Sequence, residues 1–414
     1  MNKLEELIKE FCPNGVEYIS VEELLKEKTI SSITPSLKIK RNDYKDFGEI
    51  SIISQEEEYI SGYCNIFDKK IIDGQYVCFG DHTENVKYVD FRFVQGADGL
   101  KIICCNNKEK IDIKYFYYAV CNFYKRHNNY ERHYKYFVEL QIPLPALPVQ
   151  REIVRILDSF TLYSAELTAE LTVRRKQYEF YRDKLLSFNH VQYKEVALLE
   201  LLSQSITDGP HETPVFVDSG IPFISAEAIH DTRIDFSKIR GFISSEYNKQ
   251  CNKKYKPQIN DVFMVKSGST TGKVAMVTDS REFNIWSPIA AMRTNKSLLP
   301  RYLFYILQTK DIQNQVVKYA SNGSQPNLSM RKLEQFKIKV PPMEVQERIV
   351  RVLDNFDAIC SDLGIGLPAE IEKRQKQYEY YREKLLTFDN KFATILDRQT
   401  DRQTDRKSAC RERV

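Results

Sequence analysis

One helical segment occurs twice in this chain of 414 residues, and the repeat constrains the fold more than any other feature. The copies occupy residues 149–190 and 344–390. They open with VQREIVRILDSF and VQERIVRVLDNF, and they close with KQYEFYRDKLLSF and KQYEYYREKLLTF. Because repeats define the units of a fold, they are considered before local structure. The spacing is far too long for a solenoid, so the sequence predicts a duplicated domain, each copy followed by a helix.

The first copy has the heptad pattern of a coiled coil, with apolar residues spaced alternately by four and three. At about 1.5 Å per residue, its roughly forty residues span about 60 Å. The second copy is the evident partner, and we expect an antiparallel pairing within the chain. The predicted coiled-coil seam consists of Ile153, Leu157, Phe160, Leu167, Leu171, Tyr178, Tyr181, Leu185, Phe188, Ile349, Leu353, Phe356, Tyr378, Tyr381, Leu385 and Phe388.

The second copy contains an insertion of four residues relative to the first. The offset between copies is 196 residues at their openings and 200 at their closings, as Phe160 with Phe356 and Tyr181 with Tyr381 show. Such a stutter unwinds a coiled coil locally. It coincides with Gly and Pro residues, so we expect the helix to break near 364–368 and to restart with Pro368 in its first turn. A bend without a role and a functional hinge both remain open.

The two segments outside the helices, residues 1–148 and 191–343, follow one plan. Each contains short apolar runs separated by turn residues, which predict strands of a small, mainly antiparallel sheet with helices. Tyr302–Tyr305 in the second segment corresponds to Tyr115–Tyr118 in the first, and both runs are predicted to lie in the hydrophobic core. The predicted class is therefore α+β, with two similar domains separated by two long helices that form an antiparallel coiled coil.

Composition excludes several classes of protein. No apolar run approaches the roughly 18 residues of a membrane span. Nine cysteines without a CxxC pair favour a reducing cytoplasm and argue against a disulfide framework or a zinc site. The net charge of +4 permits nucleic-acid binding but does not require it.

The motifs of the common catalytic classes are absent from the sequence. There is no Asn-Pro-Pro-Tyr/Phe or Asp-Pro-Pro-Tyr motif of an amino-methyltransferase, no glycine-rich nucleotide fingerprint and no HExxH. The stretch 268–273 resembles a P-loop, but its glycines are one residue too close and Val274 replaces the Ser/Thr ligand of magnesium. We therefore predict no catalytic residue, no metal site and no cofactor in this chain.

Two kinds of loop are candidates for DNA contact. Residues 266–273 combine small hydrogen-bond donors with two lysines, and Gln and Asn in 321–327 are natural adenine readers. Residues 125–135 form a basic cluster with aromatic residues at the same relative place in the first segment. A solvated turn or a solvated charge run explains each loop equally well. The candidate DNA-binding residues are Arg126, His127, Arg132, His133, Lys135, Lys266, Ser267, Gly268, Thr270, Thr271, Lys273, Ser324, Gln325 and Asn327.

The last segment, residues 391–414, is polar and of low complexity, and we expect it to be disordered. Asp-Arg-Gln-Thr repeats from Asp397, and a GACA tract in the gene would encode this cycle. A phase-variable gene and an ordinary linker remain alternatives, which the codons of this region would distinguish.

The helical repeats, together with the stretches 364–371 and 208–211 (Asp-Gly-Pro-His), resemble those of the specificity subunit of type I restriction–modification systems. The resemblance covers about residues 1–390 and is most specific in the helices. It implies target-recognition domains at 1–148 and 191–343, each reading one half of a bipartite target in double-stranded DNA. Two different readers joined by a spacer also fit half-sites at a fixed distance.

The resemblance further implies a cytoplasmic, non-catalytic subunit without membrane contact. Its implied partners are two methyltransferase subunits and restriction/motor subunits, which would carry S-adenosylmethionine, ATP and magnesium. A specificity module of a methyltransferase-only complex is an alternative, and a non-DNA coiled-coil scaffold is a weaker one. The scaffold explains the heptads but leaves the duplicated domains unexplained.

Overall fold

The computed structural model describes residues 2–65, 71–96, 98–188, 192–230, 232–321, 325–361 and 366–388. It divides into two compact units. The first unit comprises Met1–Glu166 with Lys373–Val414, and the second comprises Leu167–Glu372. Both divisions fall inside the repeated helical segments, so each unit holds one globular segment and parts of both helices. The predicted disordered tail, residues 391–414, lies outside the described residues.

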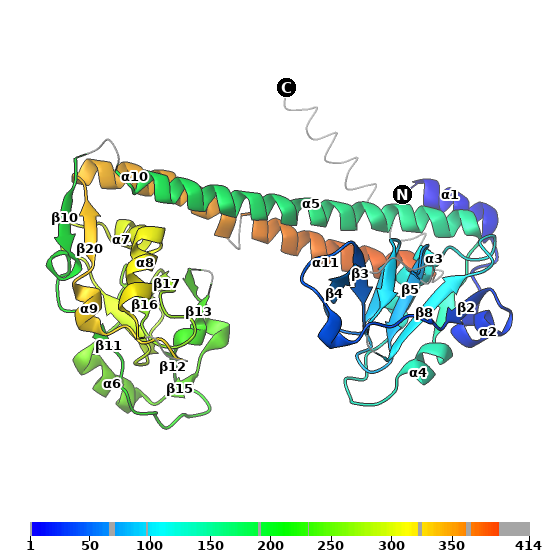
Figure 1. Ribbon diagram of the computed structural model, residues 1–414, viewed down its shortest axis with the longest axis horizontal. Helices are drawn as coiled ribbons and strands as arrows, with labels where there is room; N and C mark the ends of the chain where they lie inside the picture. The colour runs from blue at the N-terminus through cyan, green and yellow to red at the C-terminus, as the bar shows by residue number, and fades with distance from the viewer. Residues whose placement is uncertain are drawn as a thin grey trace, which may run out of the picture. The chain divides into compact units, whose positions relative to one another are not determined.

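The first unit begins with a helix and continues through short strands (Figure 1). Its elements are α1 (Asn2–Phe11), β1 (Tyr18–Ser20), α2 (Val21–Lys26), β2 (Ile30–Ile33), η1 (Arg41–Asp43), β3 (Ile50–Ile53), β4 (Gly62–Cys64), β5 (Tyr76–Gly80), β6 (Val86–Val89), β7 (Phe93–Gln95), β8 (Leu100–Cys105), α3 (Ile113–Phe123), α4 (Tyr134–Glu139) and β9 (Gln141–Pro143). The first part of α5 (Leu147–Leu185) and most of α11 (Leu367–Leu386) complete it.

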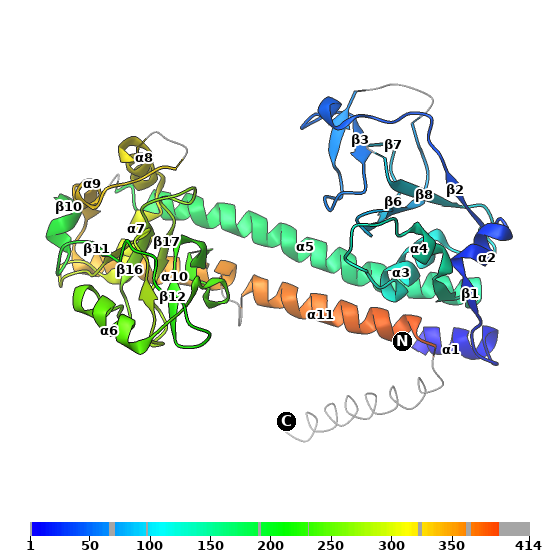
Figure 2. The ribbon, with the colours of Figure 1, turned by 90° about the horizontal axis from the view of Figure 1, so that it is seen from below.

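The described strands of the first unit form three small sheets. An antiparallel sheet has the order β2-β8-β5-β6. A second sheet has the order β4-β3-β7, in which β3 is antiparallel to β4 and parallel to β7 (Figure 2). β1 pairs with β9. The helix α3 packs against β5 and β6, and Asp112 caps it by accepting hydrogen bonds from two backbone N–H groups.

One core joins the sheet of the first unit to its helices. Tyr115 and Phe116 of α3 are fully buried, as the sequence predicts for this aromatic run. Ile153 and Leu157 of α5 and Leu385 of α11 belong to the same core. Burying each such side chain contributes about 1.5–3 kcal/mol. The helices are therefore part of the folded unit and not a detached spacer.

The second unit repeats this order with additional elements. They are β10 (Lys194–Ala197), η2 (Leu198–Leu201), β11 (Thr207–Asp208), β12 (Ile221–Ile224), η3 (Ala226–Ala228), β13 (Ile229–His230), β14 (Arg233–Ile234), η4 (Phe236–Lys238), β15 (Gly241–Ile243), α6 (Ser245–Lys254), β16 (Val262–Val265), β17 (Val274–Met276), β18 (Asn284–Ile285), β19 (Ile289–Met292), α7 (Pro300–Leu307), α8 (Lys310–Tyr319), α9 (Met330–Glu334), β20 (Lys337–Val340) and α10 (Met343–Ser361).

The sheets of the two units match strand for strand. In the second unit the orders are β11-β19-β16-β17, β15-β12-β18 and β10-β20, and β12 with β18 is again the parallel pair. The hairpin β13–β14 and the helices α6 and α8 have no counterpart among the described elements of the first unit. The predicted α+β class with two similar, mainly antiparallel domains is confirmed.

Each unit contains an antiparallel helix contact. In the first, Phe160 near the start of α5 stacks on Tyr381 near the end of α11, with ring centroids 5.3 Å apart. In the second, Phe356 of α10 stacks on Tyr181 near the end of α5, at 5.7 Å. The same two positions of the repeat therefore meet twice. α10 ends at Ser361 and α11 begins at Leu367, while residues 362–365 lie outside the described residues.

The predicted seam residues differ in burial. The buried members are Ile153, Leu157, Leu167, Tyr178, Phe188, Ile349, Leu353 and Leu385. The half-buried members are Phe160, Leu171, Leu185, Phe356, Tyr378, Tyr381 and Phe388. Tyr181 is 37% exposed, so its ring covers Phe356 from the solvent side. Among the helices in the described ranges, none combines the length and hydropathy needed to span a bilayer.

Candidate nucleic-acid interface

In the first unit, a loop that contains candidate DNA-binding residues lies beside a turn that the sequence analysis did not single out. They are the turn between β5 and β6, residues 81–85, and the loop between α3 and α4, residues 124–133. The backbone N–H of His133 donates to the carbonyl oxygen of Asp81 at 2.8 Å. We call these residues the first paired-loop edge.

The second unit pairs the corresponding loops. Residues 266–273 between β16 and β17 lie against the loop that precedes α9. The backbone N–H of Leu328 donates to the carbonyl oxygen of Lys266 at 2.7 Å, and that of Gly268 donates to Pro326 at 3.0 Å. Residues 266–273 and 325–329 form the second paired-loop edge. The two loops that the sequence analysis predicts to contact DNA in this unit are therefore neighbours in space.

Equivalent backbone hydrogen bonds within each unit show which positions of the two edges correspond. The N–H of Gly80 donates across its turn to the carbonyl of Asn85 at 2.9 Å, and the N–H of Val265 donates to that of Lys273 at 2.8 Å. Asp81 and Lys266, the next residues, therefore hold the same place in the two units. The same backbone position therefore carries an acidic residue in the first unit and a basic residue in the second.

A buried carboxylate organises the first edge. Glu84 is 3% exposed and accepts hydrogen bonds from the backbone N–H groups of His127 at 2.9 Å and Asn128 at 3.1 Å. The ring of His127 and the hydroxyl of Tyr124 lie at 3.0 and 3.1 Å. Burial alone would raise the pKa of Glu84, but these donors together lower it below its ordinary value. Glu84 thus holds residues 124–128 against the turn.

The predicted residues of the first edge fall into two groups. His133 is fully buried, so the expectation that its ring contacts DNA is corrected. Arg126 is exposed and donates to Asn85 Oδ1 at 2.8 Å, and Arg132 is exposed. Lys135 is exposed but paired with Glu131 at 2.9 Å. The surface cations of this edge are therefore Lys125, Arg126 and Arg132, with His127 partly exposed, and Lys135 lies just beyond the edge in α4.

A buried ionic cluster lies beneath the second edge. The Asp208 side chain is completely buried, and Lys254 Nζ donates to its Oδ1. Its Oδ2 faces Lys266 Nζ and His211 Nε2, each at 3.3 Å, without a hydrogen bond of good geometry to any described residue. The Lys266 side chain is only 11% exposed. The expectation that Lys266 contacts DNA is therefore corrected, because its charge is directed at Asp208.

The remaining candidates of the second edge are nearer the surface. Gly268 has φ +101° with open space around it, and the Thr271 hydroxyl donates to its carbonyl at 2.7 Å, which closes the loop. Gly268 and Thr271 are partly exposed, and the other partly or fully exposed candidates are Ser267, Thr270, Lys273, Gln325 and Asn327. Ser324 lies outside the described residues.

Asp208 belongs to the Asp-Gly-Pro-His stretch, whose conformation requires glycine. A Cβ atom on Gly209 would lie 1.8 Å from the carbonyl oxygen of Ile285. The N–H of Ser287 donates to the carbonyl of Pro210 at 3.2 Å. A cavity of about 200 Å³ opens beside this turn and is lined by Asp208, Gly209, Pro210, Tyr247, Gln250, Cys251, Lys254, Tyr255 and Asn284.

Several residues of the edges were missed by sequence reasoning. Asp81, Glu84 and Asn85 were missed because acidic and amide side chains in a short turn do not predict a DNA contact. Asp208 and Lys254 are 46 residues apart, so only the fold brings them together. The motif around Asp208 was the one available signal.

Each recognition segment is anchored to a repeated helix by one aspartate. In the first unit, Asp158 of α5 accepts hydrogen bonds from the Tyr118 hydroxyl at 2.6 Å and Lys114 Nζ at 2.9 Å. In the second, Asp354 of α10 accepts from the Tyr305 hydroxyl at 2.5 Å and Arg301 Nε at 2.7 Å.

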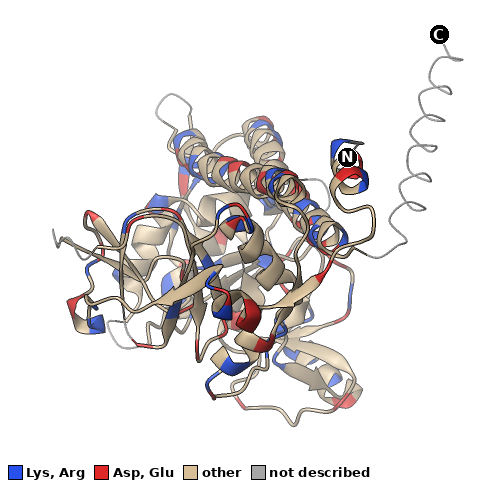
Figure 3. Cartoon of the chain, turned by 90° about the vertical axis from the view of Figure 1, so that its right-hand side faces the viewer, with Lys and Arg blue, Asp and Glu red and all other residues tan. Residues whose placement is uncertain are grey.

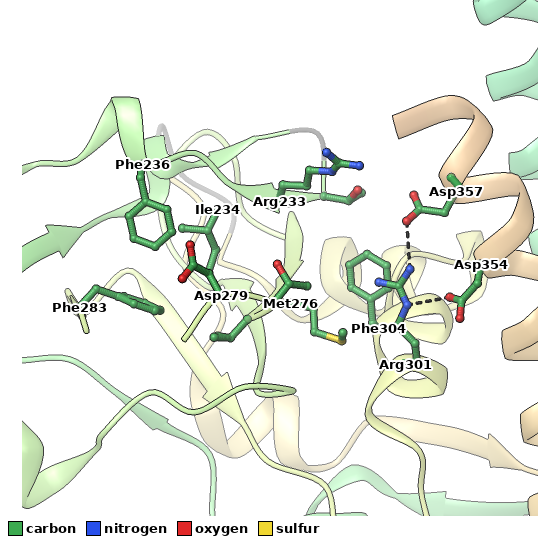
Figure 4. Close-up of a pocket in the computed structure, with 14 residues that line it drawn as sticks. Arg233, Ile234, Phe236, Met276, Asp279, Phe283, Arg301, Phe304, Asp354 and Asp357 are labelled. Atoms are coloured by element: carbon green, nitrogen blue, oxygen red, sulfur yellow. Dashed lines mark hydrogen bonds and ion pairs between the residues drawn. The ribbon is translucent and has the colours of Figure 1, made fainter. Parts of the chain in front are cut away.

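The anchor of the second unit has an additional acid (Figure 4). Arg301 reaches Asp357 Oδ2 at 3.1 Å as well as Asp354. These residues form one wall of a cavity of about 340 Å³, and Phe236 and Phe283 lie on its other side. The cavity depends on the additional hairpin β13–β14, so it belongs to the second unit alone among the described residues.

A glutamine reinforces each anchor. Gln150 donates to the carbonyls of Lys110 and Pro145 and accepts from the N–H of Asp112. Gln346 makes the same three bonds to Ser297, Pro341 and Leu299. Both glutamine side chains are buried. Figure 3 shows Lys and Arg interspersed with Asp and Glu on the helices and the globular segments, in keeping with the small net charge.

These features define a class of protein: two similar domains, each anchored on a repeated helix and each presenting a different polar edge. The family model described as "Type I restriction modification DNA specificity domain" matches residues 13–173 and 216–373. The chain belongs to this family of type I specificity subunits, as its sequence resemblance implies.

Individual relatives agree with the family match. The EcoR124I/EcoR124II specificity subunit of Escherichia coli is 31% identical over 369 residues, which cover 84% of this chain and 90% of the relative. A putative type I restriction enzyme specificity subunit of Haemophilus influenzae is 29% identical, with coverage of 80% and 86%. The S subunit from M. genitalium shares the fold, with a TM-score of 0.54, 14% identity and coverage of 90% and 97%.

Proposed function

We propose that each paired-loop edge reads one half of a bipartite DNA target and that this chain supplies the sequence specificity of a type I restriction–modification complex. The observation that carries the proposal is that two units of the same fold present different side chains at equivalent edges. Strand order and helix anchors are the same in both units, whereas the side chains at the edges differ. A duplicated scaffold with two different polar surfaces suits two different half-sites.

The chemistry of the second edge suits base reading. The amides of Gln325 and Asn327 match the donor and acceptor pattern of adenine in the major groove. Ser267 and Thr270 offer hydroxyls that accept or donate, and Lys273 is an exposed cation for a phosphate.

The first edge differs in chemical type. Arg126 and Arg132 present guanidinium groups, which recognise guanine edges or phosphates. Its buried carboxylate Glu84 holds the loop from beneath by accepting backbone hydrogen bonds. We infer that the two half-sites differ in base composition.

The chain acts as a non-catalytic subunit in this proposal. Two methyltransferase subunits and the restriction/motor subunits bind the repeated helical segments, and they carry S-adenosylmethionine, ATP and magnesium. A solved structure that shares this fold, with a TM-score of 0.52, 18% identity and coverage of 90% and 98%, concerns "complex assembly and conformational transition of the type I R-M system". A net charge of +4 is sufficient if partners supply some of the phosphate contacts.

The test is genome-wide adenine methylation in cells that express the chain with its methyltransferase. Deleting this chain alone should abolish one bipartite methylated motif. The double variant Gln325→Ala/Asn327→Ala should alter or weaken one half-site and leave the other unchanged. Gln335→Ala, an exposed amide of the same segment outside the edge, is the matched control and should change neither half.

A motif that survives deletion of the chain would contradict the proposal. So would a change of both half-sites in the double variant, because each edge is expected to read one half alone. Restriction of unmethylated phage DNA in the same cells separates a full restriction complex from a methyltransferase-only one.

A further inference from the structure

Three side chains of the first paired-loop edge direct ligand atoms at one point. Glu84, His127 and His133 place a carboxylate oxygen and two ring nitrogens within 4.8 Å of one another. Glu84 Oε1 lies 3.0 Å from His127 Nδ1 and 3.4 Å from His133 Nε2. Glu84 and His133 are buried, and His127 is partly exposed. The cluster is therefore built into the edge and open on one side.

The hydrogen bonds of His133 fix which nitrogen faces the cluster. Its Nδ1 lies 3.1 Å from the carbonyl oxygen of Asp81, which only accepts, and this contact suits the tautomer with the proton on Nδ1. In the neutral ring, Nε2 then presents a lone pair. This backbone orientation of a buried imidazole is typical of histidines that bind metals.

A fourth donor atom lies at the same point. Asn129 Oδ1 is 2.7 Å from His133 Nε2. The amide of Asn129 is oriented by its nitrogen, which donates to Glu131 Oε1 at 2.9 Å. Two oxygens therefore face a ring nitrogen that has no proton in the neutral form. Such convergence of lone pairs requires either an extra proton or a cation between them.

We propose that Glu84, His127, His133 and Asn129 bind a divalent transition-metal ion of the zinc type. Zinc–nitrogen bonds of about 2.0–2.1 Å in a tetrahedral site place neighbouring ligand atoms about 3.3 Å apart. The separations of 3.0 and 3.4 Å between Glu84 Oε1 and the two ring nitrogens are close to that spacing, and the 2.7 Å between Asn129 Oδ1 and His133 Nε2 is shorter and would lengthen around an ion. The two imidazoles favour zinc over magnesium or calcium, and a carboxylate oxygen is an accepted third ligand of zinc.

The ion would join residues 127–133 to the β5–β6 turn and so order the first edge. The second edge has no equivalent, since residues 266–273 and 325–329 contain neither histidine nor carboxylate. The prediction of no metal site rested on cysteine spacing, whereas these ligands are brought together only by the fold. The metal site does not depend on the proposed DNA target, and its test uses no DNA.

The experiment measures zinc itself on the full-length chain. The chain is loaded with zinc, dialysed, and analysed for bound metal by atomic spectroscopy, with melting temperature measured with zinc and with a chelator. His127→Ala is the main variant because His127 is exposed, whereas Glu84 and His133 are buried, so its loss spares the core. His82→Ala is the matched control, because His82 lies in the same edge outside the cluster and contacts Glu131 and Tyr130.

The wild type and His82→Ala should each retain about one zinc ion per chain and melt at a lower temperature with chelator. His127→Ala should lose the ion and its response to chelator, and cobalt should give a tetrahedral absorption spectrum in the wild type and in His82→Ala but not in His127→Ala. The proposal is overturned if the wild type retains no more zinc than His127→Ala. It is equally overturned if His82→Ala loses the ion as well.

Discussion

In the first unit Asp81 follows β5 and lies 3.9 Å from Lys101, whereas in the second unit Lys266 follows β16 and lies 3.3 Å from Asp208. The two positions are equivalent in the backbone, yet their charges are reversed. Each charge is compensated from a different strand, β8 in one unit and β11 in the other. The frame therefore tolerates a complete change of side chains at the edge, provided that each buried charge retains a partner.

The contacts with the helices show the opposite behaviour. Tyr118 with Asp158 and Tyr305 with Asp354 are the same pair in the two units. An edge can therefore change what it reads without disturbing how its domain is held on the helix.

The largest effect is expected from breaking the buried charge cluster of the second unit. Asp208→Ala leaves Lys266, which is 11% exposed, without its partner, and should destabilise the second unit by about 3 kcal/mol. Asp208→Ala/Lys266→Met should recover most of this loss, because an apolar side chain replaces the orphaned charge. Hydrogen exchange resolved by unit measures both variants. A double variant no more stable than Asp208→Ala would contradict this account.

The matched change in the first unit should cost less. Asp81→Ala removes one hydrogen bond from the backbone N–H of Tyr134, at 3.0 Å, and a weak contact with Lys101, which is 36% exposed. We expect a loss of about 1 kcal/mol, confined to the first unit. Equal losses for Asp81→Ala and Asp208→Ala would show that the charge reversal has no energetic asymmetry.

The next effect tests whether the anchors are equivalent. Gln150→Ala and Gln346→Ala each remove three hydrogen bonds and leave buried backbone groups unsatisfied. Each should cost about 2–3 kcal/mol, and each should act on its own unit alone. Unit-resolved hydrogen exchange provides the measurement, and exposed Gln335→Ala is the control. A loss that spreads equally to both units would argue against independent anchors.

A smaller effect, limited to acid pH, should distinguish the two edges. The pKa of Glu84 is lower in the folded chain than its ordinary value, so the unfolded chain binds more protons between those two pKa values. The stabilisation is complete above the unfolded pKa of about 4.3 and is lost as pH falls through the folded pKa. Glu84→Gln should remove this part of the pH dependence from the first unit.

The measurement is unfolding of the full chain as a function of pH, with chelator present so that no metal competes with protons. The second unit should titrate alike in the wild type and in Glu84→Gln, because Glu84 belongs to the first unit. An unchanged acid limb in the first unit would show that Glu84 is not the group responsible.

Much of the fold was predictable because it is periodic or repeated. The heptads located the helices, and the aromatic run at Tyr115 and Tyr302 marked the core of both units. The glycines and Pro368 marked the interval between α10 and α11. These features depend on residues close together in the chain, which sequence patterns record directly.

The edges were less predictable because their chemistry depends on distant pairs. Sequence placed His133 and Lys266 at the surface as cations, and the structure buries both beside acids that lie 49 and 58 residues away, Glu84 and Asp208. A charged residue in a polar loop has the same sequence signature whether it faces solvent or a buried partner. The exposed amides of Gln325 and Asn327 remain candidate DNA contacts.

The smallest effect concerns the cation of each anchor. Arg301 bridges Asp354 and Asp357, whereas Lys114 pairs with the acid Asp158, and Thr161 occupies the position that corresponds to Asp357. Arg301→Lys loses the forked contact and should cost about 0.5–1 kcal/mol, since a lysine cannot reach two carboxylates in the same geometry. Lys114→Arg should change stability by less than about 0.5 kcal/mol, because the introduced guanidinium group has no second carboxylate to pair with. Thermal unfolding of both variants and of Lys114→Arg/Thr161→Asp provides the comparison. If the added acid makes the first anchor as sensitive to the Arg→Lys change as the second, Asp357 accounts for the difference between the anchors. If it does not, the bridging contact contributes nothing beyond the single ion pair, and the two anchors are energetically the same.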